Sequence, residues 1–324
     1  MKHSSVAGIL IALIFSLFIS CQSYSQHTTQ LEHTEVQRII DTCLSAFRIH
    51  YIYPEVADKM ARYIQKRLAD GEYNNLSALE ELTGQIKTDL RQISNDRHIW
   101  VDIMENLPVT ETASKEKIIN EKKQNNFGFV KLEIFPGNIG YIRLDGFNDL
   151  QYARDTAIHA MGMLANSRAI ILDLRENHGG HENMVHFIAS YFFEEKTQLN
   201  SLYFREADSL VEGWTDPAVP GLKLIRQRLY LLTSQNTASG AESFAYTMQN
   251  YHRATIVGER TRGAAHWTES FQFPDLGIFL EIPVARPINP ITQKGWEGDG
   301  VIPDIEVNSE AALDKAHKLA LEQL

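Results

Sequence analysis

The feature that most constrains the fold is the run Ala169–Leu174, six residues that are apolar except for Asp173. A short apolar run of this kind is typical of a strand that is buried on both faces. Other strand patterns occur along the chain, and helical patterns separate them. Strands that alternate with helices predict an α/β core with a largely parallel sheet. Strands are expected at 130–134, 139–144, 229–233 and 254–258, a hairpin at 271–284, and helices at 149–166, 183–193, 241–250 and 310–321.

A different pattern precedes this core. The apolar residues from Val36 to Phe47 recur at spacings of three and four, and similar stripes run over 56–68 and 79–93. Such stripes predict short helices that pack as a small bundle, with Cys43 in its interior. The domains are therefore expected as a helical bundle at 27–103, a polar linker at 104–126 and the α/β core at 127–324.

The N-terminus has the composition of an export signal. Lys2 and His3 precede the apolar run Val6–Ile19, which is shorter than the roughly 20 residues of a membrane-spanning helix. We expect residues 1–26 to be a signal peptide and the protein to reach the periplasm or cell envelope. Two cleavage sites compete: a lipobox ending at Cys21, which would anchor the protein through a lipid, and a small-x-small site before Gln26.

The composition argues against some classes of binding partner. The chain has 324 residues, 44% of them hydrophobic, and a net charge of −10. An acidic chain without a basic run argues against nucleic acid as a partner. The twelve histidines include no pair at zinc-ligand spacing with a third partner, so we expect neither a metal site nor a cofactor.

Ser239 is the first candidate catalytic residue. It follows an apolar strand and precedes a helical pattern, so its hydroxyl would lie at a helix N-terminus beside free backbone N–H groups. Acyl transfer needs a nucleophile next to donors for the developing oxyanion. Serine is also a favoured N-cap, and the local pattern alone favours that simpler role.

Gly179 and Gly180 form the second candidate. Paired glycines after a buried strand allow positive φ and close backbone approach, and their amides could complete an oxyanion hole. An ordinary strand-to-helix turn explains them equally well. A serine nucleophile also needs a base, and spacing does not choose among His98, His178 and His266.

Seven short segments occur together, in the order Tyr53-Pro54-Glu55, Asp96-x-His98, Gly140-Tyr141-Ile142, Asp173-Leu174-Arg175-x-Asn177-x-Gly179-Gly180, Ser239-Gly240-Ala241-Glu242-x-Phe244-Ala245, Val257-Gly258-Glu259-x-Thr261-x-Gly263 and Glu297-Gly298-x-Gly300-Val301-x-Pro303-Asp304. In this order they resemble the C-terminal-processing (tail-specific) serine peptidase family. The branch containing the tricorn core and the interphotoreceptor retinoid-binding protein modules is the more similar one. The resemblance covers about residues 33 to 308.

The resemblance implies a fold and a set of roles. The fold is a ClpP/crotonase-like α/β core after the bundle. Ser239 is then the nucleophile, and its own amide or that of Gly240, with the Gly179–Gly180 turn, forms the oxyanion hole. In the tricorn-like branch the base is a histidine at the end of the bundle, which matches His98, and a glutamate matches Glu297. Apart from the resemblance, Glu242 and His266 are candidate supporting residues. If His98 only caps or packs at the junction of bundle and core, His266 is the alternative base.

Three departures from the family pattern matter. The lysine that serves as base in the Ser–Lys branch is replaced by Ala264, so a Ser–Lys dyad is not expected. The tricorn-like branch has a serine just before the histidine, where this chain has Arg97. Only about 30 residues separate His98 from the first core strand, too few for an inserted PDZ domain.

The sequence therefore predicts an exported serine endopeptidase that acts on peptides or unfolded proteins. The main alternative is a non-catalytic module that binds an apolar ligand such as a retinoid or a fatty acid, as the retinoid-binding relatives suggest. A crotonase-like acyl-CoA enzyme fits poorly, because acyl-CoA is cytoplasmic and the chain carries an export signal.

Overall fold

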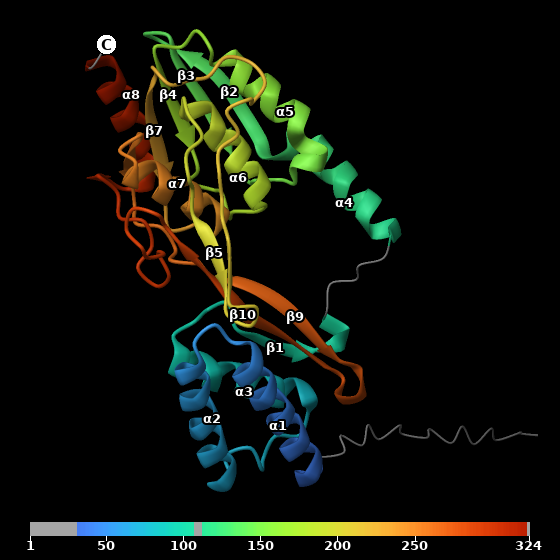
Figure 1. Cartoon of the computed structure of the whole chain (residues 1–324). Coiled ribbons are helices and arrows are strands. Elements are labelled where there is room, and N and C mark those ends of the chain that lie inside the picture. The colour runs from blue at the N-terminus through green and yellow to red at the C-terminus, as the bar shows by residue number, and fades with distance from the viewer. Residues whose placement is uncertain (1–30, 107–111, 323–324) are drawn as a thin grey trace, which may run out of the picture.

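The computed structural model describes residues 31–106 and 112–322. An α/β core and a helical bundle form two lobes, and a long ribbon of strands joins them (Figure 1). The predicted signal peptide and Cys21 lie outside the described residues. Among the described residues, no helix combines the length and apolar character needed to cross a bilayer.

The bundle consists of α1 (His33–His50), α2 (Pro54–Ala69) and α3 (Leu79–Ser94). The apolar stripes of the three helices face one another and form a common core, as predicted. Cys43 is fully buried in this core, and burial raises the pKa of its thiol to about 12. The thiol is therefore neutral and has a packing role, as the sequence indicated.

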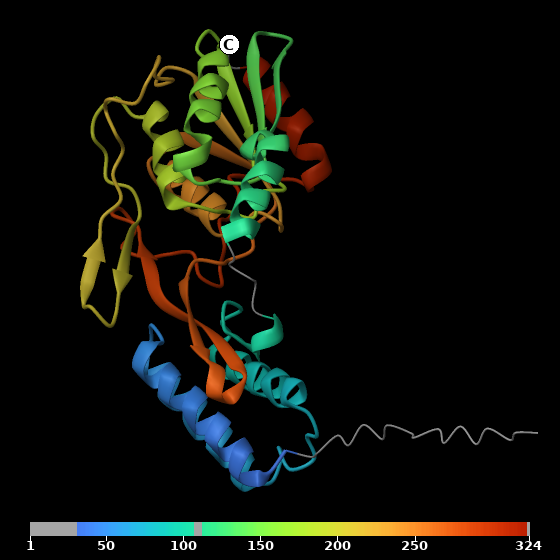
Figure 2. The same ribbon diagram turned by 90° about the vertical axis from the view of Figure 1, so that its right-hand side faces the viewer.

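The bundle core is completed by strands from elsewhere in the chain. β1 (Trp100–Ile103) pairs antiparallel with β10 (Ile278–Ile288), which also pairs with β9 (Trp267–Phe273) and β5 (Ser201–Phe204); β6 (Ser209–Val211) pairs with β5. Alternate residues of β10, including Ile278 and Ile282, are buried against the bundle helices. The hairpin predicted at 271–284 thus exists, and Figure 2 shows it reaching from the core to the helices.

The core sheet has the strand order β11-β8-β7-β4-β3-β2. All neighbouring pairs are parallel except β2 with β3, which confirms the predicted, largely parallel sheet. The strands are β2 (Phe129–Phe135), β3 (Ile139–Leu144), β4 (Ala169–Asp173), β7 (Arg228–Thr233), β8 (Ala254–Gly258) and β11 (Ile305–Glu306).

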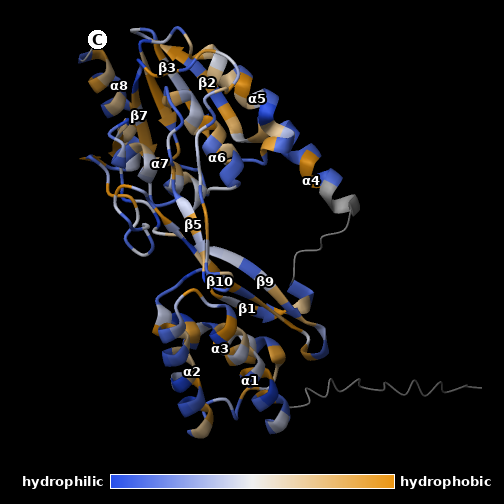
Figure 3. Ribbon diagram, viewed as in Figure 1, coloured by the Kyte–Doolittle hydropathy of each residue, from blue (hydrophilic) through white to orange (hydrophobic). Residues whose placement is uncertain are grey.

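Helices cover both faces of this sheet. Ile170 and Leu172 of β4 pack toward α5 (Leu150–Met163), α6 (Glu182–Ala189) and α7 (Gly240–Asn250), while Ala169 and Ile171 pack toward α8 (Ala312–Glu322). Adjacent residues of a strand point to opposite faces, so burial on both sides requires the continuous apolar run seen in the sequence. Figure 3 shows apolar residues gathered along β4 and β7.

The stretch 104–126 contains more structure than a linker. α4 spans Thr112–Gln124, although the sequence has no helical period there. Its residues from Glu116 onward are mostly exposed. An apolar period records burial of one helix face, so a solvated helix leaves no such signal. The short 3-10 helices are Met104–Asn106, Asn126–Gly128, Ser190–Phe192, Pro274–Leu276 and Ser309–Ala311.

Candidate active site

Ser239 lies between β7 and α7, at the edge of the sheet where the parallel strands end. Ser239 is exposed to solvent, and its backbone has φ 53° and ψ −122°. Ordinary N-cap residues have β-region backbone angles, and a non-glycine residue at positive φ is strained by about 1–3 kcal/mol. Simple helix capping therefore does not explain this conformation.

The Gly179–Gly180 turn, which follows β4, packs directly on Ser239. A Cβ atom on Gly179 would lie 2.7 Å from both the Ser239 Cβ and the Gly240 nitrogen. The backbone angles φ are +99° at Gly179 and +132° at Gly180, a region that favours glycine. Asn177, fully buried, fixes the turn by accepting the Gly179 N–H at 2.8 Å and donating to the Leu144 carbonyl at 2.8 Å.

This close packing leads to a stability prediction with a matched control. Gly179→Ala and Gly221→Ala both place a side chain at positive φ, but a Cβ on Gly221 would meet nothing within 4 Å. Backbone strain should cost about 1–2 kcal/mol in either variant, and the clash should add about 1–3 kcal/mol for Gly179→Ala alone. The measurement is urea unfolding of both variants. Equal losses of unfolding free energy would mean that the turn moves aside freely.

Glu242 ties Ser239 to the loop that follows β8. Its buried carboxylate accepts the Ser239 N–H at 2.9 Å, the Gly263 N–H at 2.7 Å, the Ala264 N–H at 2.9 Å and the Thr261 hydroxyl. Burial raises the pKa of Glu242, and these four hydrogen bonds oppose the shift. Because the Ser239 amide is occupied by Glu242 and the Gly179 amide by Asn177, the Gly180 and Gly240 amides remain as candidate oxyanion donors.

A second group of side chains lies at the junction of bundle and core. Asp96, only 2% exposed, accepts the His98 N–H at 2.9 Å, and its Oδ1 lies 3.1 Å from His98 Nδ1. Its Oδ2 lies 2.8 Å from His266 Nδ1 and accepts the Tyr51 hydroxyl at 3.0 Å. Asp96 thus holds both histidine rings.

Glu297 belongs to the same group. Its Oε1 lies 3.7 Å from His98 Nδ1 and its Oε2 lies 3.7 Å from His266 Nδ1. The Oε2 atom also accepts the backbone N–H groups of Ala265 at 2.7 Å and His266 at 3.1 Å. The structure therefore brings together Glu297 and His98, which the resemblance assigned to one site, and places His266 beside them.

The two histidines differ in access. The His98 side chain is 19% exposed, whereas that of His266 is 2% exposed and its Nε2 is buried without a hydrogen-bond partner among the described residues. Burial lowers the pKa of His98, but its hydrogen bond to Asp96 and the charge of Glu297 outweigh burial, so the net shift is upward. Burial raises the pKa of Asp96, but the hydrogen bonds from His266 and His98 hold it well below its usual range.

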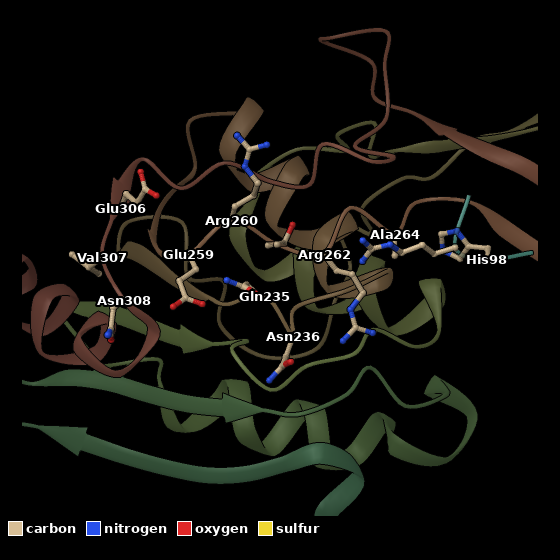
Figure 4. A pocket seen from close by; sticks show the side chains of 12 residues that line it. His98, Gln235, Asn236, Glu259, Arg260, Arg262, Ala264, Glu306, Val307 and Asn308 are labelled. Atoms are coloured by element: carbon tan, nitrogen blue, oxygen red, sulfur yellow. The ribbon is translucent and has the colours of Figure 1, made fainter. Parts of the chain in front are cut away.

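Residues of this region line two hollows. One, of about 990 Å³, has His98 and Ala264 at one end, Gln235, Asn236 and Arg262 in its middle, and the segment 306–308 at the other end (Figure 4). Another, of about 730 Å³, is lined by the Gly179–Gly180 turn, residues 145–148 and one side of α4. Charged and amide side chains line the first hollow together with Ala264 and Val307, so its wall offers both polar and apolar surface.

No hydrogen bond joins Ser239 to either His98 or His266 among the described residues. The link runs from Ser239 through Glu242 to the loop 261–266, and from that loop through Glu297 to the histidines.

The sequence did not predict the roles of Asp96 and Asn177 in this arrangement. Asp96, noted only as part of the resemblance, is closer to His98 than Glu297 is. Arg97, which departs from the family pattern, is exposed, and its carbonyl accepts a hydrogen bond from Arg91 at 2.7 Å. Its position therefore supplies no hydroxyl to His98, and the carboxylate of Asp96, one residue earlier, makes the contact.

The sequence likewise gives Asn177 only as a residue of a motif. Its place two residues before paired glycines is the one sequence signal for its role in fixing the turn.

Two family models match this chain. The model for peptidase family S41 matches residues 138–307. The model for the N-terminal domain of peptidase S41 in eukaryotic IRBP matches residues 27–127. Among curated proteins, the carboxyl-terminal-processing protease of Picosynechococcus sp. is 30% identical over 203 residues, which cover 60% of this chain and 47% of that protein. The enzyme of the same name from Synechocystis sp. is 33% identical over 158 residues, covering 48% and 35%.

Solved structures extend the similarity to the whole fold. A protein from Parabacteroides merdae superposes with a TM-score of 0.64 at 17% identity, covering 90% of this chain and 98% of its own. The tricorn protease superposes with a TM-score of 0.58 at 13% identity, covering 90% and 37%. The matched region spans less than half the length of the two curated relatives. Since the family model covers more than half of the 324 residues, the chain belongs to peptidase family S41.

Proposed function

We propose that the chain is an exported serine endopeptidase in which Ser239 forms the acyl-enzyme. The observation that carries the proposal is the exposed, positive-φ Ser239 at the N-terminus of α7, packed against the Gly179–Gly180 turn. Strained strand-to-helix turns that expose a serine are a known solution for nucleophiles. Membership of the S41 family supports the same chemistry.

His98 is the proposed general base, and Asp96 is the residue that positions it. If Asp96 accepts the Nδ1–H of His98, the lone pair of His98 is at Nε2 and can take a proton. Glu297, at 3.7 Å, adds negative charge that favours the imidazolium formed on proton transfer. His266 is a weaker candidate because its Nε2 is buried.

The reaction then proceeds in two balanced steps. Ser239 Oγ attacks the peptide carbonyl carbon, and its proton passes to His98 Nε2. The same proton goes to the leaving amine as the C–N bond breaks. Water, deprotonated by His98, then hydrolyses the ester and restores Ser239. The Gly180 and Gly240 amides are the proposed donors to the oxyanion.

A peptide or an unfolded protein is the proposed substrate. An extended chain across Ser239 could occupy both the hollow beside His98 and the hollow beside Gly180. The distance between Ser239 and His98 would close when substrate orders the junction, since catalytic hydrogen bonds are often long in free enzymes. The charged lining beside His98, which includes Arg97 and Arg262, disfavours an apolar ligand such as a retinoid.

Labelling with a fluorophosphonate tests the nucleophile directly. The reagent should modify one serine, and peptide mapping should locate the adduct on Ser239. The Ser239→Ala variant should remain unlabelled. A wild-type chain that stays unlabelled but binds a fatty acid stoichiometrically would favour the non-catalytic module.

Export is proposed from the Val6–Ile19 run. The mature protein should begin at Cys21 or at Gln26 when its N-terminus is sequenced from cell-envelope fractions. Membrane association that persists in a Cys21→Ala variant would exclude the lipid anchor. A cytoplasmic protein that begins at Met1 would contradict export altogether.

A further inference from the structure

Asp96, His98, His266 and Glu297 form a cluster with a capacity beyond hydrolysis. Each offers one nitrogen or carboxylate oxygen, and these atoms all lie within 4.8 Å of one another. The residues come from three segments: the turn between α3 and β1, the residue just before β9, and the loop after β10. No local motif could therefore have revealed this junction cluster.

The distances within the junction cluster are near those of a tetrahedral metal site. His98 Nδ1 lies 3.1 Å from Asp96 Oδ1 and 3.7 Å from Glu297 Oε1. His266 Nδ1 lies 2.8 Å from Asp96 Oδ2 and 3.7 Å from Glu297 Oε2. A zinc ion with ligands at 2.0–2.1 Å requires ligand separations of about 3.3–3.4 Å. The four separations lie on both sides of this value. Because each histidine faces a different oxygen of each carboxylate, the two carboxylates would have to turn so that one oxygen of each meets the ion.

Charge favours a cation at the same point. Among the described residues, the ion pairs of Asp96 and Glu297 involve only His98 and His266, with no lysine or arginine. Two carboxylates and two neutral imidazoles carry a net charge of −2, which a divalent ion neutralises. Since the side chain of Asp96 is 2% exposed, water screens little of its charge.

Outer hydrogen bonds hold the carboxylates in place, as they do around metal ligands. The Tyr51 hydroxyl donates to Asp96, and the Ala265 and His266 amides donate to Glu297. His98 lines the hollow of about 990 Å³, which supplies an entry path. Two imidazoles beside two carboxylates suit zinc and its neighbours rather than calcium or magnesium, which prefer all-oxygen shells.

We propose that the junction cluster binds one divalent transition metal ion, with zinc as the best match. Nδ1 of each histidine and one oxygen of each carboxylate would be the ligands. This departs from the expectation of no metal site, which rested on spacing along the chain. Spacing does not detect ligands that only the fold assembles.

Binding would inhibit hydrolysis, a consequence that rests on the proposed function. A metal on His98 Nδ1 displaces the proton from that atom, and the neutral ring then carries its proton on Nε2. His98 could no longer accept the proton of Ser239. The ion would thus act as a reversible inhibitor and not as a catalyst.

The test uses the full chain as Ser239→Ala, so that binding is measured apart from hydrolysis. After chelation and desalting, Co²⁺ should bind one per chain with the visible absorption of a tetrahedral site, and one equivalent of Zn²⁺ should displace it. His266→Gln and Glu297→Gln should each weaken Zn²⁺ binding by more than about 100-fold, since even outer-shell changes cost 10–100-fold.

His50→Gln is the matched control, because His50 pairs with Glu206 at 2.7 Å on the surface, outside the junction cluster. It should leave the Zn²⁺ affinity unchanged. The proposal is overturned if no metal binds, or if binding is the same in folded His266→Gln and Glu297→Gln variants. Binding that fails to inhibit an active wild-type enzyme would leave the metal site standing and count against His98 as the base.

Discussion

Ser239→Ala should lower kcat for peptide hydrolysis by at least about 10⁴-fold, because a nucleophile and its base act as a unit. The fold should survive, since the change removes one exposed hydroxyl and at most an N-cap contact worth about 1 kcal/mol. Steady-state kinetics on an unstructured peptide, with thermal unfolding alongside, would measure both effects.

Ser243→Ala is the control for this variant. Ser243 lies on the same helix, is buried, and accepts a hydrogen bond from Asn200 at 3.0 Å. Losing that bond should reduce stability by about 1 kcal/mol and leave hydrolysis largely intact. Turnover retained in folded Ser239→Ala would move the nucleophile elsewhere, with Ser234 and Ser243 as the candidates.

His98→Ala should lose nearly as much activity as Ser239→Ala, and His266→Ala much less. A general base removed from such a unit costs about 10⁴-fold or more in kcat. His266 would contribute mainly by holding Asp96, through its 2.8 Å contact. Both variants should be assayed with a chelator present, so that a bound metal does not obscure the comparison.

The reverse ranking of the two folded variants would refute the assignment. His266 would then be the base, and the site would lie closer to the α/β core than to the bundle. Retained activity in His98→Ala would also leave the bundle without a catalytic role.

The Asp96→Asn variant tests whether Asp96 positions His98 or only stabilises the fold. An asparagine can donate to His98 Nδ1, which favours the tautomer with its proton on Nε2 and removes the base. We expect kcat to fall by about 10²–10⁴-fold with little change in KM. Tyr51→Phe, which removes one hydrogen bond to Asp96 but keeps both imidazole contacts, should lose far less. Equal effects of the two variants would indicate a purely structural role for Asp96.

The α/β core and the bundle could be predicted because their signals are local. The run Ala169–Leu174 reports burial on both faces, and the stripe from Val36 to Phe47 reports burial on one. The exposed helix α4 has no apolar period, so the polar sequence around it predicts a linker and not a helix. The sequence also could not predict which strand packs against the bundle, since β10 pairs with β1 from some 180 residues further along the chain.

The residues of the candidate site likewise fall into two groups: those that the local sequence identifies and those that only the fold brings together. The sequence by itself determined that Ser239 follows a buried strand and begins a helix, and that paired glycines follow the neighbouring strand. These are consequences of periodicity and glycine geometry within a few residues. Only the tertiary structure decided that Asp96 and His266, 170 residues apart, share one hydrogen bond, and that Glu297 joins them. The physical reason is that a hydrophobic pattern specifies which face of an element is buried, but not which distant segment covers it.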